Sequence, residues 1–164
     1  MRRTAISTTV LALALFAAPV TAHANTEWPS AAALTGTNAP IKVKLTVQGP
    51  DGLLFKGKVR TKGHAVTPAT GGTHTCDGTN AGANPSPVPT PTAALDDAAR
   101  VNGFTWDGTW YPSFDDYLVE SVKNVKSDAT AYWSISVNGT PTPVGGCQFK
   151  LNAGDDVAFT WTTL

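Results

Sequence analysis

The chain is short of charge, and the charge that it has is balanced. Only 15% of its 164 residues are charged, with 12 Lys and Arg against 12 Asp and Glu. If the first 24 residues are cleaved, Arg2 and Arg3 are lost, and 10 basic residues then face 12 acidic ones, a net charge of −2. Such a chain has no positive field to attract nucleic acid or an anionic membrane. We therefore expect no nucleic-acid partner.

Catalytic motifs are missing as well. The chain has three histidines, and only His64 and His74 follow the first 24 residues. Neither lies beside an activating motif, and there is no Gly-x-Ser-x-Gly elbow or phosphate-binding loop. His74, Cys76 and Asp77 could be read as metal ligands, but zinc needs three or four, and Cys76 is more plausibly a bridge partner. We predict no catalytic residue, no metal site and no cofactor, and a hydrolase is the least favoured class.

Three pairs of adjacent aspartates, at positions 96/97, 115/116 and 155/156, invite comparison with a carboxylate dyad. Neighbouring residues point to opposite faces of a strand and diverge by about 100° on a helix, so neither pair member faces the other. A dyad would need two carboxylates brought together from separate elements. Helix charge and turn capping explain these acids more simply.

Long apolar runs are also absent, except for one short stretch near the start. Arg2 and Arg3 precede an apolar segment over residues 10–18, and Ala22-His23-Ala24 has the form of a cleavage site. The segment is well short of the roughly 20 residues that span a bilayer. We expect residues 1–24 to be a signal peptide, residues 25–40 a loose N-terminal extension, residues 41–164 one domain, and the protein to be secreted without a membrane span.

Cysteine is scarce too: Cys76 and Cys147 are the two in the chain, 71 positions apart. Two cysteines in an exported protein most often pair, and a loop of that length would contribute about 4 kcal/mol on the chain-entropy model. A free thiol and an intermolecular bridge are the alternatives. Neither cysteine has a basic neighbour in sequence that would favour a reactive thiolate.

Alternating apolar and polar residues predict a hairpin at the start of the domain. Residues 41–47 and 53–61 alternate, and Gly49-Pro50-Asp51-Gly52 between them is typical of a turn. One face of the second strand should hold Leu53, Phe55, Gly57 and Val59. The opposite side carries Lys56, Lys58, Arg60 and Lys62, which we interpret as a solvated face in preference to a ligand patch.

Periodicity is lost over residues 64–92, where Pro85, Pro87, Pro89 and Pro91 favour extended polyproline II. We interpret this segment as a strap across the domain in preference to a linker between two domains, since neither side could bury a good core alone. Residues 92–101 predict the one convincing helix, with acids in its early turns, and Gly103 stops it.

The remainder predicts strands. Residues 104–111 place aromatic side chains around an expected turn at Asp107-Gly108, and strands are expected over residues 116–125, 131–137 and 157–161. Asn138-Gly139 is a strong hairpin signal. The order of elements predicts an α+β domain, mostly antiparallel sheet with a single α-helix.

Aromatic side chains are the best candidates for a binding surface. Trp133 has an alternating strand face to explain it as core, whereas Trp106 and Trp110 flank the expected loop and are less easily buried. Exposed aromatics on a secreted domain suggest stacking on a flat ligand or a sugar.

Several segments are similar to one family, the transcobalamin C-terminal-like domain, which occurs in secreted bacterial and fungal proteins. The resemblance rests on residues 73–80, 94–99, 104–109, Tyr132-Trp133, Val137-Asn138-Gly139, residues 144–147, Leu151, Gly154-Asp155 and Val157. It implies antiparallel sheets with one helix, and a disulfide between Cys76 and Cys147. In the vitamin B12 carriers the similar domain closes over the corrinoid together with a large helical domain, which has no counterpart in these 164 residues.

The resemblance implies a secreted, non-enzymatic binding module for a small molecule, corrinoid-like or glycan, acting as a monomer. An extracellular adhesion or structural protein is the alternative. The candidate ligand-binding residues are Trp106, Trp110, Tyr111, Tyr132, Trp133 and Asn138.

Overall fold

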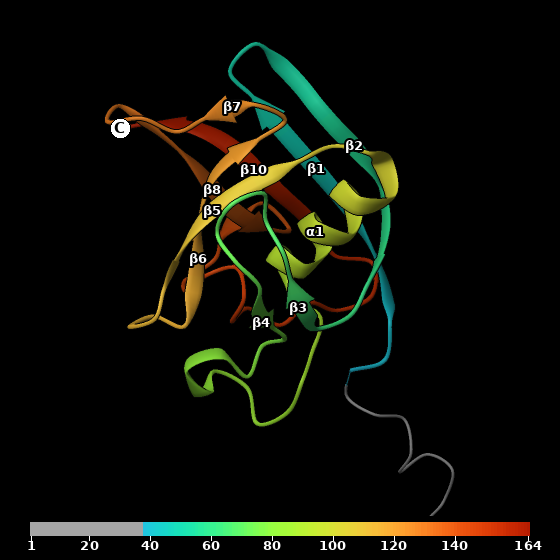
Figure 1. Cartoon of the computed structure of the whole chain (residues 1–164). Coiled ribbons are helices and arrows are strands. Elements are labelled where there is room, and N and C mark those ends of the chain that lie inside the picture. Colours follow the sequence, from blue (N-terminus) through green and yellow to red (C-terminus); the bar gives the residue numbers. More distant parts are fainter. Residues whose placement is uncertain (1–37) are drawn as a thin grey trace, which may run out of the picture.

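The computed structural model describes residues 38–164. The predicted signal peptide and most of the predicted N-terminal extension lie outside the described residues. Within residues 38–164 the chain forms one α-helix, one 3-10 helix and ten strands in three sheets, which confirms the predicted α+β class (Figure 1). No helix in this range is long and apolar enough to cross a membrane.

The largest sheet has five strands and supplies much of the core. In spatial order they are β2 (Gly52–Thr61), β1 (Ile41–Gly49), β10 (Asp156–Thr163), β8 (Ala131–Val137) and β9 (Thr140–Pro141). All neighbours are antiparallel except β1 and β10, which run parallel with Leu45 opposite Val157. Because these two strands lie inside the sheet, Leu45 and Phe159 are fully buried.

The predicted β1–β2 hairpin is confirmed, but the predicted face of Leu53 is wrong. A bulge between Val47 and Gln48 makes Leu54 an extra residue on β2, and extra residues change which side chains face inward. Leu53 is therefore 56% exposed, while Leu54 packs against the core. The basic residues of β2 are exposed, as expected.

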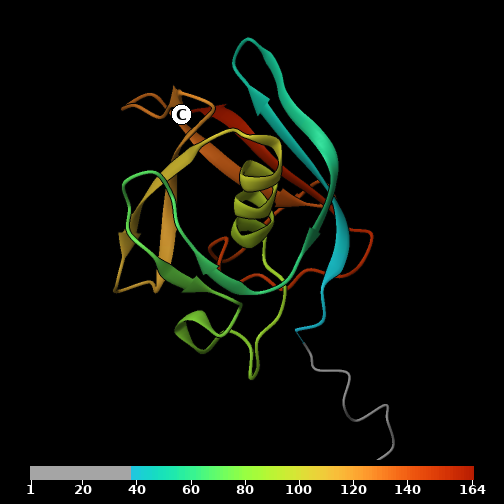
Figure 2. The same cartoon turned by 45° about the vertical axis from the view of Figure 1, so that its right-hand side comes forward.

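The helix α1 (Pro91–Asn102) matches the prediction closely because both ends carry strong local signals. The side chain of Thr90 accepts a hydrogen bond from Ala93 N at 3.3 Å, and Gly103 ends the helix with a left-handed backbone, φ 66°. Figure 2 shows the helix in the middle of the molecule, with β1 and β2 on one side and β5 and β6 on the other. The expected acids of the early turns are absent from the first turn: Asp96 and Asp97 lie mid-helix and contact other side chains.

A three-stranded antiparallel sheet lies on the other side of the helix. It contains β5 (Trp106–Tyr111), β6 (Asp116–Val122) and β7 (Val125–Lys126). The expected turn at Asp107–Gly108 is wrong, because β5 continues through both residues to Tyr111. The register with β6 shifts at this point, with Glu120 as the extra residue on β6.

The segment between the hairpin and the helix runs along the domain as a strap. It contains the short strands β3 (His64–Val66) and β4 (His74–Cys76), which pair with each other, and the 3-10 helix η2 (Asn80–Gly82). Val88 and Thr90, further along, are buried. Cys76 and Cys147 form the expected disulfide, and both are completely buried.

Candidate functional site

Exposed apolar side chains gather around one groove. Of the eight large hydrophobic residues that are exposed in residues 38–164, four line it: Tyr111, Phe114, Leu118 and Val144. The groove has a volume of about 580 Å³ and lies between the β5–β6 hairpin and residues 142–148. We call it the aromatic groove. A concave site with apolar walls is typical of small-molecule binding.

Hydrogen bonds from both sides fix the hairpin that carries these aromatics. At its tip, Phe114 N donates to Tyr111 O at 3.0 Å, and Asp115 has a left-handed backbone, φ 51°. Asn80 in η2 donates to Asp115 O at 2.9 Å, and Gln148 donates to Phe114 O at 2.7 Å. The walls of the groove are thus held in place before any ligand arrives.

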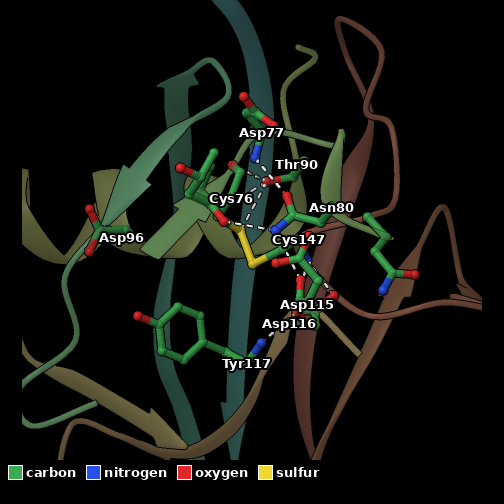
Figure 3. Close-up of a disulfide and its surroundings, with 12 residues drawn as sticks. Cys76, Asp77, Asn80, Thr90, Asp96, Asp115, Asp116, Tyr117 and Cys147 are labelled. Atoms are coloured by element: carbon green, nitrogen blue, oxygen red, sulfur yellow. Dashed lines mark hydrogen bonds between the residues drawn. A yellow bond between two sulfur atoms is a disulfide. The ribbon is translucent and has the colours of Figure 1, made fainter. Parts of the chain in front are cut away.

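The floor of the groove holds a buried acid. Asp116 is 5% exposed, and its Oδ1 accepts hydrogen bonds from Tyr117 N at 2.7 Å and Cys147 N at 3.1 Å (Figure 3). Burial raises the pKa of the Asp116 carboxyl to about 6, although both hydrogen bonds act in the opposite direction. Gly145 packs so closely over this carboxylate that a side chain there would collide with it. A titratable group therefore lies beneath an otherwise apolar site.

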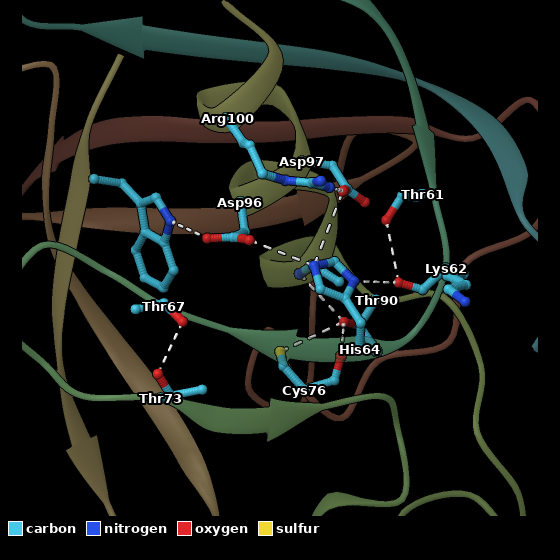
Figure 4. A network of polar contacts seen from close by, with 12 residues as sticks. Thr61, Lys62, His64, Thr67, Thr73, Cys76, Thr90, Asp96, Asp97 and Arg100 are labelled. Carbon is cyan, nitrogen blue, oxygen red and sulfur yellow. Dashed lines mark hydrogen bonds and ion pairs between the residues drawn. The ribbon is translucent and has the colours of Figure 1, made fainter. Parts of the chain in front are cut away.

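A second concave region lies beside α1 and combines charged with apolar side chains. It has a volume of about 700 Å³ and is bordered by β2, β3, the helix and the start of β5. Its charged residues are Arg60, Lys62, His64, Asp96, Asp97 and Arg100, and we call it the charged pocket. Figure 4 shows the polar network in its wall.

His64 and Asp96 are the central pair of that network. His64 Nε2 lies 3.4 Å from Asp96 Oδ2, His64 Nδ1 lies 2.8 Å from Lys62 O, and Trp106 Nε1 donates to Asp96 Oδ1 at 3.0 Å. The hydrogen bond to Asp96 raises the pKa of His64, although burial lowers it. Burial also raises the pKa of Asp96, but the hydrogen bonds from His64 and Trp106 outweigh burial and leave that pKa below its ordinary value.

A histidine beside an aspartate in a pocket is an arrangement that hydrolases also use, so the chemistry of this pair matters. Both ring nitrogens of His64 face acceptors, one a carboxylate and one a carbonyl, so the ring is best satisfied as a cation that donates twice. A general base needs a free nitrogen within reach of a nucleophile. The hydroxyl side chains that line the pocket belong to threonines, and those of Thr61 and Thr67 are hydrogen-bonded to Lys62 O and to Thr73, not to His64. The pair is suited to holding β3 against the helix.

The predicted binding residues are spread over several surfaces. Trp106 and Trp133 are each 3% exposed, so the expectation that Trp106 resists burial is wrong. The bulge at Asp107–Gly108 keeps Trp106 in a strand facing Asp96, where the expected loop would have released it. Trp110 is half-buried and stacks on His74, with ring centroids 4.1 Å apart.

Among the predicted residues, Tyr111 lines the aromatic groove and Trp106 borders the charged pocket. Tyr132 is exposed on β8, and Asn138 lies in the β8–β9 turn, where its side chain donates to Asp155 at 2.9 Å. The predicted set does not form one surface in the structure.

Sequence reasoning missed Phe114, Leu118 and Val144 as candidates. The signal for Leu118 was present: Tyr117, Leu118 and Val119 are consecutive apolar residues in a strand, so one of them must face away from the other two. Phe114 lies in the turn between β5 and β6, and Val144 lies in an irregular segment. No periodic pattern identifies these two.

The chain is similar to one protein family and to solved structures of other proteins. Residues 101–163 match a family described as a domain of unknown function (DUF4430). No curated protein sequence matches the chain. A solved structure of haptocorrin in complex with Cbi has a TM-score of 0.51 and 14% sequence identity, covering 77% of this chain. A candidate metal binding protein from Ruminococcus gnavus ATCC 29149 has a TM-score of 0.44 and 12% identity, covering 76% of this chain and 98% of that one.

The chain spans about a quarter of the haptocorrin chain, 26% of its length. At this level of identity the likeness concerns the fold alone. The protein therefore has a transcobalamin-like fold, and its C-terminal part matches a domain whose function is unknown.

Proposed function

We propose that this protein is a secreted, non-enzymatic binding module that holds a flat, largely apolar small ligand in the aromatic groove. The observation that carries the proposal is the gathering of Tyr111, Phe114, Leu118 and Val144 around one cavity of about 580 Å³. The hydration of exposed aromatic rings is unfavourable. A flat ligand that covers the rings releases this water, and that release drives binding. The fixed hairpin tip lowers the ordering cost of that step.

The fold supports the choice of ligand class. Haptocorrin, which shares this fold over part of its length, was solved in complex with Cbi. A corrinoid is flat and partly apolar, as the aromatic groove requires. Because this chain corresponds to only 26% of the haptocorrin chain, one side of such a ligand would remain in water, and we expect an affinity well below that of a carrier.

Two features support an extracellular location. The N-terminal sequence has the pattern of a signal peptide, and the fully buried Cys76–Cys147 disulfide suits an oxidising compartment. The doubly engaged ring of His64 supports a non-enzymatic role, because it offers no free base.

Glycan binding and adhesion use the same groove differently. A sugar would stack one apolar face on Tyr111 or Phe114, whereas an adhesion protein would cover the exposed patch with another protein molecule. The three candidate functions therefore differ in what covers the groove: a corrinoid-like ligand, a sugar, or another protein molecule.

The test is a calorimetric titration of residues 25–164 with cobinamide, cobalamin and soluble glycans. Tyr111→Ala should weaken binding about tenfold or more, because it removes an anchor ring from the groove. Tyr132→Ala is the matched control: Tyr132 is 39% exposed against 41% for Tyr111 but lies outside the groove, so it should leave binding unchanged.

Equal losses for the two variants, or no heat with any of the ligands, would reject a small-ligand groove. In that case sedimentation over a wide concentration range tests adhesion. If the protein self-associates and Leu118→Ala abolishes this self-association, the adhesion alternative is supported. Our own proposal predicts a monomer at every concentration.

A further inference from the structure

We infer that the charged pocket is a second binding site, which takes a small ligand with a carboxylate or phosphate group on an apolar body. Arg60 and Lys62 would contact the anionic group, and Phe104 would contact the apolar part. This inference is independent of the aromatic groove, which is lined by different residues.

The carboxylates of the pocket already have partners. Asp96 accepts from Trp106 Nε1 at 3.0 Å and lies 3.4 Å from His64 Nε2, while Asp97 is paired with Arg100. Each acid is thus matched by a base within the wall. Neither acid is left to attract a cation from outside.

The basic residues on the β2 side have no such partners. Within residues 38–164, neither Arg60 nor Lys62 forms an ion pair, and both side chains are exposed at the edge of the pocket. With His64 as a cation, four basic residues face two acids, Asp96 and Asp97. A concave surface with a positive excess concentrates anions.

The position of these two residues on the strand strengthens the inference. Arg60 is the next-to-last residue of β2, and Lys62 lies in the two-residue connection between β2 and β3, so both occur where the chain passes along the pocket. Lys56 and Lys58 belong to the same alternating row of β2 but do not line the pocket. The row is therefore a solvated face over part of its length and a pocket wall at its end.

Part of the pocket wall is apolar. Phe104 is half-buried, packs on Phe55 with ring centroids 5.4 Å apart, and still lines the pocket together with Trp106 and Ala65. An anion without an apolar body would leave this wall uncovered. A ligand that carries both parts would bury apolar surface and gain a charge-assisted contact at once.

A pair of naphthalene compounds tests this inference by NMR titration of residues 25–164 in low salt. 2-Naphthoate carries the charge, and 2-naphthamide has the same ring system without it. We expect 2-naphthoate to shift the Trp106 indole N–H and the Ala65 amide, and to bind at least about fivefold tighter than the amide. 1-Naphthyl phosphate serves to rank phosphate against carboxylate.

Two double variants localise the charge effect. Arg60→Gln with Lys62→Gln should weaken 2-naphthoate binding about tenfold. Lys56→Gln with Lys58→Gln removes the same charge from the same strand but lies outside the pocket, so it should change binding less than about twofold. Unchanged thermal unfolding of the variants verifies that each still folds.

Three results would overturn the inference. One is equal binding of the naphthoate and the amide. Another is equal weakening by the two double variants, which would indicate a general charge effect. The third is a set of shifts confined to the aromatic groove, at Leu118 and Val144, or no shifts at millimolar ligand.

Discussion

Both carboxylate oxygens of Asp116 lie 3.1 Å from the backbone nitrogen of Cys147. One short contact thus joins the floor of the aromatic groove to the segment that carries the disulfide. Asp116 begins β6, and Gly145, two residues before Cys147, packs over its carboxylate. Changes in the charge of this acid or in the disulfide should therefore reach the groove.

Replacing Asp116 with Asn should change how stability depends on pH. Burial raises the pKa of Asp116 from 3.8 to about 6, so the folded state binds more protons than the unfolded state between those values. The free energy of unfolding contributed by this group is therefore greatest below pH 4 and falls as the pH rises to about 6. Asp116→Asn, which keeps both hydrogen-bond acceptor roles at Oδ1, should remove this loss.

Urea unfolding from pH 4 to pH 8 measures this effect. The free energy of unfolding of the variant minus that of the wild type should be larger at pH 8 than at pH 4, by on the order of 2 kcal/mol. Asp51→Asn is the control, because Asp51 is exposed in the turn between β1 and β2 and does not line the groove. A difference that does not vary with pH would contradict the argument.

Removing the disulfide should weaken the domain strongly. Cys76→Ala with Cys147→Ala opens a loop of 71 residues, and the chain-entropy model assigns about 4 kcal/mol to its closure. We expect a lower denaturation midpoint in non-reducing buffer. Because both cysteines are fully buried, mild reductant should leave the folded wild type unchanged. A double variant with the wild-type midpoint would show that the bridge contributes nothing to stability.

Gly145→Ala should be more harmful than its small size suggests. The added methyl group would collide with the carboxylate of Asp116, which is buried and cannot move aside without losing its hydrogen bonds. We expect a loss of about 2 kcal/mol in chemical denaturation. Gly57→Ala is the comparison, since a methyl group there meets only the end of the Phe55 ring, and it should cost clearly less. Equal costs would refute this reading.

The His64–Asp96 pair should stabilise the fold mainly in mildly acidic solution. The pKa of His64 is raised in the folded protein, so its contribution is fully present below pH 6.5 and is lost as the pH rises through the folded value. His64→Gln should therefore lower the free energy of unfolding by roughly 1 kcal/mol more at pH 5.5 than at pH 8.5. Taking the difference from wild type at each pH cancels the titration of Asp116. A deficit that is the same at both pH values would exclude a charged pair.

The elements that the sequence predicts well are those with local signals. The helix has a capping threonine before it and Gly103 after it, and the β8–β9 turn has Asn138–Gly139, both with a positive φ. These signals act within a few residues, so they survive whatever packs around them. The structure also contains the Cys76–Cys147 disulfide, which the export signal favoured and the family resemblance implied over a free thiol or an intermolecular bridge.

Elements that depend on distant partners were not predictable. The strands β3 and β4 are three residues each, too short for a pattern, and they pair across a loop. Asp107–Gly108, usually a turn signal, lies inside β5 because β6 pairs with β5 along this stretch. The aromatic groove forms where the β5–β6 hairpin lies beside residues 142–148. No local sequence pattern predicts this contact between two separate segments of the chain.

The parallel pairing of β1 with β10 has a consequence for synthesis. Lys44 pairs with Asp156, 112 positions further along the chain, so the middle of the large sheet cannot form until β10 has emerged from the ribosome. Until then the β1 edge of the β1–β2 hairpin, which β10 covers in the finished sheet, is open. Such long-range pairing slows folding, and a nascent chain that stops before β10 would expose that edge to aggregation. Helper proteins that shield open strand edges should therefore matter most in the interval between the synthesis of β1 and that of β10.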